Sequence, residues 1–429
     1  MTTIDLTSAN PFSAEFQQCP HQYYRAMQET HPVYHVPGTD LYLVTRHELV
    51  TPILRDTATF SSRFMTGEMA TGPIVDQLRD IVATGWPNVS TMLTIDPPYQ
   101  TRYRNTVAPY FTPRRIGELR PTIEAIVERL LDALPEGESF DVVPRFAIPL
   151  PIEAIAAVLN VPTERMADFK RWSDDSIATI GANPSDERRL EAQRGIVELQ
   201  HYLAGELEAR RAEPQGDLLT EVVQAMIDTD ELDADGKPVR RLLEMPEMLS
   251  IVQQLLVAGN ETTTKAITEG VRLLAENPHE WAALRADPAG RAAAVTEEVL
   301  RLATPTQAMF RIVTKDTEVA GVPVPKGARL LVVYSAANRD TSVWGDDPDA
   351  FDPGRTNLKE HLAFGKGVHF CIGAPLSRLE MQVAFELIGR RLASIELDDD
   401  NDFEYHPSFM LRGLKRLDVT VAKGQGASA

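Results

Sequence analysis

A single cysteine in a glycine-rich loop offers the strongest chemistry in this chain. The loop reads Phe364-Gly365-Lys366-Gly367-Val368-His369-Phe370-Cys371-Ile372-Gly373, and a helical pattern over residues 374–392 follows it. Backbone N–H groups and the helix dipole at a helix N-terminus favour a thiolate over a thiol. The thiolate is the form of cysteine that ligates a metal. By itself the loop is compatible with a metal ligand, but a buried structural cysteine is the commoner use of a lone cysteine, and a nucleophile with His369 as its base would use the same residues.

The spacing of this loop resembles the haem-binding loop of the cytochrome P-450 monooxygenases, whose pattern is Phe-Gly-x-Gly-x-His-x-Cys-x-Gly. Every specified position has its match: Phe364, Gly365, Gly367, His369, Cys371 and Gly373. The resemblance implies that Cys371 is the proximal ligand to the iron of haem b, with Phe364 packed near the sulfur and His369 hydrogen-bonded to a propionate. An anionic sulfur ligand pushes electron density onto the iron and favours O–O cleavage.

A second stretch, Ala258-Gly259-Asn260-Glu261-Thr262-Thr263, lies within a long helical pattern over residues 246–277. By itself it is compatible with ordinary helix packing. Thr262 can hydrogen-bond back to the carbonyl of Ala258 and loosen one turn, and the small residues there leave room for a flat cofactor. The stretch resembles the family's distal Ala-Gly-x-(Asp/Glu)-Thr motif. That likeness implies that Ala258 contacts the haem and that Glu261 and Thr262 are the acid–alcohol pair that delivers protons beside it.

A third pattern, Glu298-Val-Leu-Arg301, places two opposite charges three residues apart on a helix expected over residues 292–302. Such a pair is commonly a surface contact worth ~0.2–0.5 kcal/mol. Here it precedes Cys371 by 73 residues, and Arg355 lies between them. The spacing is similar to the family's Glu–Arg–Arg network, which implies a buried structural network of Glu298, Arg301 and Arg355 that pins the cysteine loop.

Further matches to the family concern the haem propionates and the substrate. Arg311, on the strand expected after that helix, resembles the propionate-binding arginine, and Arg104 resembles the arginine of a helix that holds the other side. Gln100 stands where the family usually has histidine, and it can still donate a hydrogen bond. The positions that correspond to the distal pocket are apolar, which predicts a small hydrophobic substrate: Leu93, Val257, Met309, Phe409 and Met410.

Helical periodicity dominates the elements that must position these residues. Apolar steps of three and four over residues 116–134 indicate a helix with Pro121 as a break or kink. The pattern over 246–277 predicts a helix of about 30 residues, roughly 45 Å long at 1.5 Å per residue. Short strands are expected at 33–36 and 41–44, joined as a hairpin, and at 310–314 and 329–334.

We therefore predict a mainly α fold with a small β-rich part, the single-domain cytochrome P-450 fold with its long central helix over the haem. No linker divides the chain, so one domain over residues 11–422 is expected, between a flexible N-terminus (1–10) and a disordered tail (423–429). The Gly- and Pro-rich segment 73–90, which contains Trp86, is expected to form a mobile lid over the pocket.

Composition narrows the class of protein further. The 429 residues carry 43 Lys and Arg against 62 Asp and Glu, a net charge of −19. That balance argues against binding to nucleic acid or to anionic lipid, both of which attract basic residues. The N-terminus has neither a basic segment nor an apolar one, which predicts a soluble, cytoplasmic protein. Two cysteines, Cys19 and Cys371, are too few for a disulfide scaffold or a four-cysteine cluster.

The family resemblance implies a monooxygenase that inserts one atom of O2 into a C–H bond, by hydroxylation or oxidative demethylation. Electrons are expected from NAD(P)H through a flavin reductase and an iron–sulfur ferredoxin. Two alternatives share the fold: a peroxide-driven hydroxylase or coupling enzyme, and a non-catalytic haem sensor. An intact Glu261–Thr262 pair argues against the peroxide-driven enzyme, and a haem sensor has no need of proton delivery. Basic side chains expected to meet an acidic ferredoxin are Arg102, Arg114, Arg115, Lys366 and Arg378.

Overall fold

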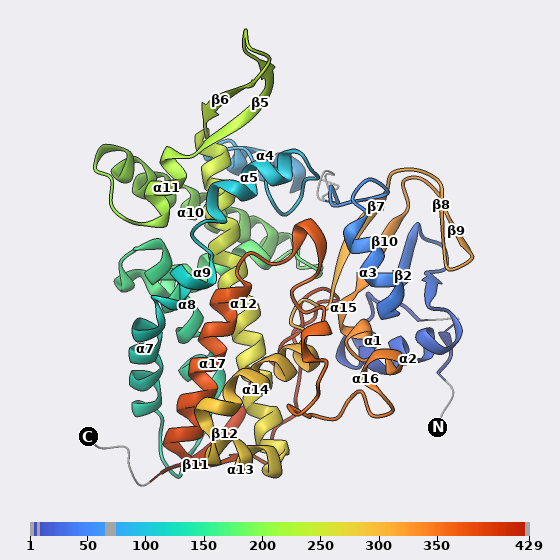
Figure 1. The fold of residues 1–429 in the computed structure, drawn as a ribbon, viewed down its shortest axis with the longest axis vertical. Helices are drawn as coiled ribbons and strands as arrows, with labels where there is room; N and C mark the ends of the chain where they lie inside the picture. The colour runs from blue at the N-terminus through green and yellow to red at the C-terminus, as the bar shows by residue number, and fades with distance from the viewer. Residues whose placement is uncertain (1–3, 7–8, 65–73, 425–429) are drawn as a thin grey trace. The chain divides into compact units, whose positions relative to one another are not determined.

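The computed structural model describes residues 4–6, 9–64 and 74–424. By its internal contacts the chain forms two compact units, each assembled from separate segments. Unit 1 comprises Met1–Ser61, Gly117–Pro151 and Glu261–Ala429, and unit 2 comprises Ser62–Ile116 and Ile152–Asn260. Because each unit interleaves distant parts of the sequence, no linker or change in composition marks the division. Figure 1 draws both units as a mainly helical chain with small sheets, as the sequence predicts.

A five-stranded sheet organises the β-rich part of unit 1, in the order β1-β2-β10-β7-β3. The hairpin expected near residue 38 is present, and the two later strands pair with each other in antiparallel fashion. Strand β10 also runs parallel to β2, so it joins the hairpin to the later strands. The bounds are β1 Val33–His35, β2 Leu41–Val44, β3 Phe60–Ser61, β7 Ala308–Val313 and β10 Arg329–Val333.

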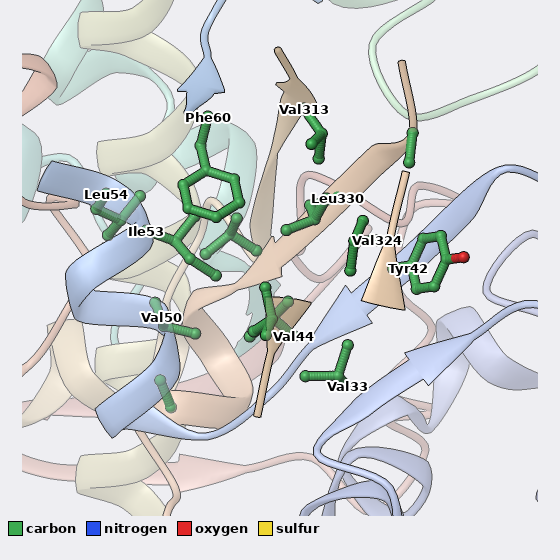
Figure 2. Close-up of a cluster of buried hydrophobic side chains, with 14 of the residues drawn as sticks. Val33, Tyr42, Val44, Val50, Ile53, Leu54, Phe60, Val313, Val324 and Leu330 are labelled. Atoms are coloured by element: carbon green, nitrogen blue, oxygen red, sulfur yellow. The ribbon is translucent and has the colours of Figure 1, made fainter. Parts of the chain in front are cut away.

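Alternate residues of this sheet enter two different hydrophobic cores, as the period of two along a strand requires. Leu330 and Val332 belong to the cluster that helix α3 (His47–Arg55) covers with Val50, Ile53 and Leu54. Figure 2 labels Leu330 and the three residues of α3 within this cluster. The intervening residues, Leu331 and Val333, enter a second cluster with Phe16, Tyr24 and Met27 of the N-terminal helices. The sheet is therefore buried on both faces.

Helices and two smaller sheets form the rest of unit 1, and α17 packs against α7, α13 and α14. Their bounds are α1 Ala14–Gln18, α2 Pro20–Thr30, α7 Arg120–Asp132, η2 Val143–Ala147, α13 Pro278–Ala286, α14 Pro288–Ala303, α15 Tyr334–Ala337, α16 Thr341–Trp344, η4 Leu358–Glu360, η5 Gly367–His369 and α17 Ala374–Arg391. The remaining strands are β4 Ser139–Asp141, β8 Thr317–Val319, β9 Val322–Val324, β11 Leu392–Leu397 and β12 Asp418–Lys423.

In its described residues, unit 2 is helical apart from one hairpin. Its elements are α4 Ile74–Val82, α5 Tyr99–Val107, α6 Pro113–Gly117, α8 Pro149–Leu159, η3 Thr163–Arg165, α9 Met166–Ile177, α10 Asp186–Ala212, α11 Leu218–Gln224, β5 Met226–Leu232 and β6 Pro238–Leu242, with α6 and α8 each crossing the division between units. The hairpin β5–β6 was not expected from the sequence. Residues on both of its faces are exposed, so it lacks the hydrophobic alternation by which a strand is recognised.

Helix α12, Met245–Glu276, supplies residues to both units and is the longest element, in yellow in Figure 1. Its 32 residues confirm the predicted long helix. Pro246 lies in the first turn, where the missing N–H costs nothing. The helix ends before Asn277, and Pro278 begins the next helix. Among the described helices, none is long and apolar enough to cross a membrane.

Several expectations about local structure need correction. Pro121 stands in the first turn of α7, so it begins a helix instead of kinking one. In the described part of the N-terminus, the hydroxyl of Tyr34 donates to the Leu6 carbonyl at 2.6 Å. At the other end Lys423 belongs to β12 and the Gly424 N–H donates to Arg391. Residues 1–3, 7–8 and 425–429 lie outside the described part of the chain.

The segment expected to be a lid contains a helix, α4, followed by a stretch attached to α10. The backbone N–H of Trp86 donates to the side-chain oxygen of Gln200 at 3.0 Å, and the Gln200 amide donates back to the Trp86 carbonyl. A ring nitrogen of His201 lies 2.9 Å from the Thr84 carbonyl. Opening of residues 84–86 would therefore have to break these bonds or carry α10 along. Pro73 lies outside the described residues.

Candidate functional site

The glycine loop of unit 1 places Cys371 directly before a helix N-terminus, as the sequence predicts. Helix α17 begins at Ala374. The Cys371 N–H donates to the Phe364 carbonyl at 2.9 Å, and the Phe370 N–H donates to the Gly367 carbonyl at 3.0 Å. These bonds close the loop, and the helix dipole behind it favours a thiolate at Cys371.

Both the backbone conformation at position 367 and the close packing around it require glycine. Its φ of +74° lies in the left-handed region that side chains disfavour. A Cβ at this position would lie 2.5 Å from the Leu54 carbonyl oxygen of α3. The loop therefore rests on the backbone of α3, and a larger residue would displace it.

The side chain of Cys371 is exposed in the protein alone, which overturns the alternative of a buried structural cysteine. A Cβ built on Gly373 would lie 3.9 Å from its sulfur, an ordinary contact distance. Among the described residues, no group of three or more His, Cys, Asp or Glu side chains is placed to hold a metal ion. An accessible thiolate at the end of a fixed loop suits a metal that arrives with most of its own ligands, as haem iron does.

Arg311 provides the test of whether the chain fits a haem. The residue lies on β7 and is 3% exposed. Its Nη1 donates to the Phe310 carbonyl at 2.7 Å, but its buried Nε has no hydrogen-bond partner in the described residues. Burial raises the pKa of the neighbouring Tyr334, and the charge of Arg311 partly offsets that rise. A buried cation with an unused donor is costly unless an anion meets it, so the site fits a carboxylate such as a propionate.

Three residues brace the cysteine loop, and sequence reasoning did not identify two of them. Arg378 of α17 donates to both carboxylate oxygens of Glu297, at 2.6 and 2.8 Å, and a ring nitrogen of His361 lies 3.1 Å from the same carboxylate. The Arg378 guanidinium also lies 4.6 Å from the ring centroid of Phe364. Burial alone would raise the pKa of Glu297, but the hydrogen bonds from Arg378 and His361 outweigh it and lower that pKa to about 2.

The Glu–Arg–Arg network is present and fully buried at its centre. Arg301 donates to both oxygens of Glu298 at 2.7 Å, both side chains are 0% exposed, and Arg355 lies 3.3 Å from Glu298. The arginines also donate to backbone carbonyls between Asn338 and Ala350. The expected contact with the cysteine loop is therefore indirect: the network holds residues 338–350, and Asn338 in turn accepts the Leu362 N–H at 2.6 Å.

The acid–alcohol pair lies on α12, at the start of its unit 1 portion. Glu261 is 7% exposed and Thr262 is partly buried. Ala258, one turn earlier, belongs to unit 2 and is exposed. A Cβ on Gly259 would meet Ile155 at 3.4 Å, so this glycine is not a tight packing notch. The role of the pair in proton delivery stays a prediction.

Gln100 and Arg104 share one face of α5 in unit 2, because residues four apart in a helix lie one above the other. Gln100 is 0% exposed and its side-chain oxygen accepts from Thr101 at 3.1 Å. Arg104 is half-buried. Their contact with haem propionates stays a prediction, as does that of His369, which ends the short helix η5.

The residues expected in the distal pocket differ in their surroundings. Leu93 is 43% exposed, Met410 is buried, and Met309 packs beside the sheet core. Phe409 packs against Phe12 and Phe310, with ring centroids 4.9 and 5.8 Å apart. Its ring is therefore used in packing the N-terminal core. Val257 lies on the unit 2 portion of α12, and a shared pocket stays a prediction.

Four of the five basic residues expected to meet a redox partner are already paired with acids. Arg102 lies 2.9 Å from Asp230 and Arg115 lies 2.5 Å from Glu221, both in unit 2. In unit 1, Lys366 lies 3.7 Å from Glu360, and Arg378 is committed to Glu297. Arg114 is exposed. The positive charge available to a partner is therefore smaller than the sequence suggested.

The fold and the cysteine loop together define a haem-thiolate protein. The family model for cytochrome P450 matches residues 292–415. The erythromycin C-12 hydroxylase of Saccharopolyspora erythraea is 37% identical over 406 residues, 94% of each chain. The 6-deoxyerythronolide B hydroxylase of the same organism is 34% identical over 98% of this chain and 100% of its own length.

A solved structure agrees with these relatives. Cytochrome P450 CYP109Q5 from Chondromyces apiculatus is 32% identical, with a TM-score of 0.82 over 97% of this chain and 99% of that one. The chain belongs to the cytochrome P450 family. It is a monooxygenase of the oxidoreductase class, and its cofactor is haem b with its iron.

Proposed function

We propose that this monooxygenase hydroxylates a C–H bond of a small hydrophobic molecule, with electrons passed from NAD(P)H through a flavin reductase and an iron–sulfur ferredoxin. The observation that carries the proposal is the cysteine loop, closed by the Cys371-to-Phe364 hydrogen bond and set before α17. The names of the relatives support hydroxylation over demethylation, since both described above are hydroxylases. The apolar character of Leu93, Val257, Met309 and Met410 supports a hydrophobic substrate.

In this proposal the chain's own residues hold the cofactor. The sulfur of Cys371 would ligate the iron, and the side chains that would neutralise or hydrogen-bond the propionates are those of Arg311, His369, Gln100 and Arg104. Bound haem supplies dioxygen activation, which a thiolate ligand favours through electron donation. The brace of Glu297, His361 and Arg378 keeps the sulfur at one position, because it fixes the ring of Phe364 at the start of the loop.

Proton delivery is assigned to Glu261 and Thr262. The Thr262 hydroxyl would donate its proton beside the bound cofactor, and Glu261 would return one to it. General acid–base delivery of this kind typically contributes 10²–10⁴-fold. The pair supports a monooxygenase over a peroxide-driven hydroxylase, since peroxide brings its own protons, and over a haem sensor, which has no use for proton delivery.

Two assays in sequence test the proposal. A panel of hydrophobic ligands is first screened for the shift of haem iron from low to high spin, which reports displacement of water by a ligand that fits. The ligand that shifts the spin is then incubated with NAD(P)H, reductase and ferredoxin, or with hydrogen peroxide alone. We expect a hydroxylated product from the first mixture. Product formed only with peroxide, or no product from either mixture, would contradict the proposal.

A further inference from the structure

A buried ion pair joins Glu261 to the residue one turn later on the same helix. The Nζ of Lys265 lies 2.5 Å from Oε2 of Glu261, and the two side chains are 8% and 10% exposed. The acid precedes the base by four residues, the favourable orientation for a helical pair. Both residues belong to unit 1. Buried lysines are rare unless a partner neutralises them, so this pair needs an explanation.

A glycine makes room for the lysine. A Cβ built on Gly413 would lie 2.2 Å from Cγ and 2.8 Å from Cδ of Lys265. The segment that carries Gly413 is held by a β-bridge between Tyr405 and Leu414, and by the His406 N–H, which donates to the Gly413 carbonyl at 3.0 Å. The lysine stem is therefore covered by backbone, which restricts where the ammonium group can go.

The pairing has a direct consequence for the carboxylate. A buried carboxyl without a cationic partner is driven toward its neutral form. A fixed ammonium at 2.5 Å reverses that preference and holds the carboxylate in one rotamer. A carboxylate fixed in this way beside Thr262 is placed to accept a proton and to pass it on as Thr262 gives its own away.

We propose that Lys265 is a positioning residue for proton delivery: it keeps Glu261 ionised and fixed beside Thr262, and Gly413 admits it to this place. The inference rests on the proposed function of Glu261 and Thr262. It goes beyond that function by naming the partner on which the acid depends.

Infrared spectroscopy of the haem-loaded protein tests, without turnover, whether Lys265 keeps Glu261 ionised. Four proteins are compared: the parent, Glu261→Gln, Lys265→Met and the double variant. We expect a protonated-carboxyl band in Lys265→Met that is absent from the double variant, and no difference of that kind between the parent and Glu261→Gln. Absence of the band in Lys265→Met would overturn the proposal, as would a protonated-carboxyl band in the parent that Glu261→Gln removes.

Two further variants keep this test decisive. Lys415→Met removes an exposed lysine, paired with Glu404, from the segment that covers Lys265, and it should leave the spectrum of the parent unchanged. Gly413→Ala presses on the lysine stem without removing its charge, and it should also produce the carboxyl band. If Lys265→Met fails to fold, the presence or absence of the band in Gly413→Ala decides the test.

The partition of electrons between hydrogen peroxide and water tests whether Lys265 supports proton delivery. Its outcomes also separate this inference from the proposed function. With NAD(P)H, reductase and ferredoxin but no substrate, the fraction of electrons released as hydrogen peroxide instead of water is measured. We expect Lys265→Met to raise this fraction several-fold, as Glu261→Gln does, and the double variant to raise it no further. If Glu261→Gln changes the fraction and Lys265→Met does not, the inference fails alone. If neither changes it, the assigned role of Glu261 fails as well.

Discussion

Arg378 donates hydrogen bonds to both carboxylate oxygens of Glu297, and its guanidinium lies over the ring of Phe364. The arginine comes from the helix that follows Cys371, the acid from α14, and the ring from the first residue of the glycine loop. One side chain thereby ties both ends of the cysteine loop to the helical core. The sequence had suggested Arg378 as a contact for a redox partner, but its geometry assigns it to this brace.

Replacement of Glu297 by glutamine is expected to loosen the loop. Arg378 and His361 would lose their charged acceptor, and hydrogen bonds to charged groups contribute about 1.5–3 kcal/mol each. With the exposure of Arg378 taken into account, we expect the free energy of unfolding to fall by about 2 kcal/mol, measured by urea titration. A free energy of unfolding unchanged from that of the parent would contradict the brace.

The same carboxylate predicts a pH dependence. The pKa of Glu297 is lowered to about 2 in the folded protein, from an ordinary value of 4.5. A group whose pKa is depressed by folding stabilises the protein above its ordinary pKa and loses that contribution as the pH falls toward the folded value. Between pH 4.5 and 2 the parent should therefore lose stability more steeply than Glu297→Gln. Parallel curves for the two proteins would show that Glu297 is not the group responsible.

Arg311 is expected to control haem retention. Its buried Nε has no partner in the described part of the chain, so Arg311→Leu removes a cation that only an added anion would satisfy. We expect this variant to release haem to an acceptor protein at least several-fold faster than the parent does. Arg329→Leu on the neighbouring strand is the matched control, because Arg329 is only partly buried and is paired with Asp40. Equal rates for Arg311→Leu and the control would refute the assignment.

Thr262→Ala should separate cofactor binding from proton delivery. The variant removes one hydroxyl from a partly buried position on α12, so haem content and ligand-induced spin shifts should match those of the parent. More of the NAD(P)H consumed should appear as hydrogen peroxide, at the expense of product. The ratio of product to NAD(P)H measures this directly, and an unchanged ratio would exclude Thr262 from the relay.

Arg114→Glu is expected to slow electron transfer from an acidic ferredoxin. Arg114 is the better position to reverse, because Arg115 already pairs with Glu221 and its reversal would place two acids together. Salt screens charges beyond about 10 Å at 0.1 M, so the slowing should be larger at low ionic strength. If electron transfer to Arg114→Glu is as fast as to the parent at every salt concentration, Arg114 does not contribute to ferredoxin binding.

Residues with strict chemical and spatial requirements could be predicted from the sequence. Cys371 and the loop around it are of this kind, because Gly367 must accept a positive φ and a close approach to α3. The pairing of Glu298 with Arg301 is another, because an acid and a base three apart on a helix face each other; the burial of the pair was implied only by the family resemblance.

Other features depend on contacts that a linear pattern does not encode. Glu297 stands directly before the Glu298-Val-Leu-Arg301 pattern and does not belong to it, and His361 carries no motif of its own. The acid-rich strand β5 has exposed side chains on both faces, so periodicity does not reveal it. The Lys265 pair depends on Gly413, almost 150 residues away in the sequence.

The ligation of iron by Cys371 is the central claim, and one spectrum tests it most directly. Carbon monoxide is added to the dithionite-reduced holoprotein, and the position of the Soret band is recorded for the parent, for Cys371→His and for Cys19→Ser. We predict the long-wavelength Soret band of a thiolate-ligated haem in the parent and in Cys19→Ser, and its loss in Cys371→His. A thiolate-type band that survives in Cys371→His, or one that is missing from the parent, would contradict the account.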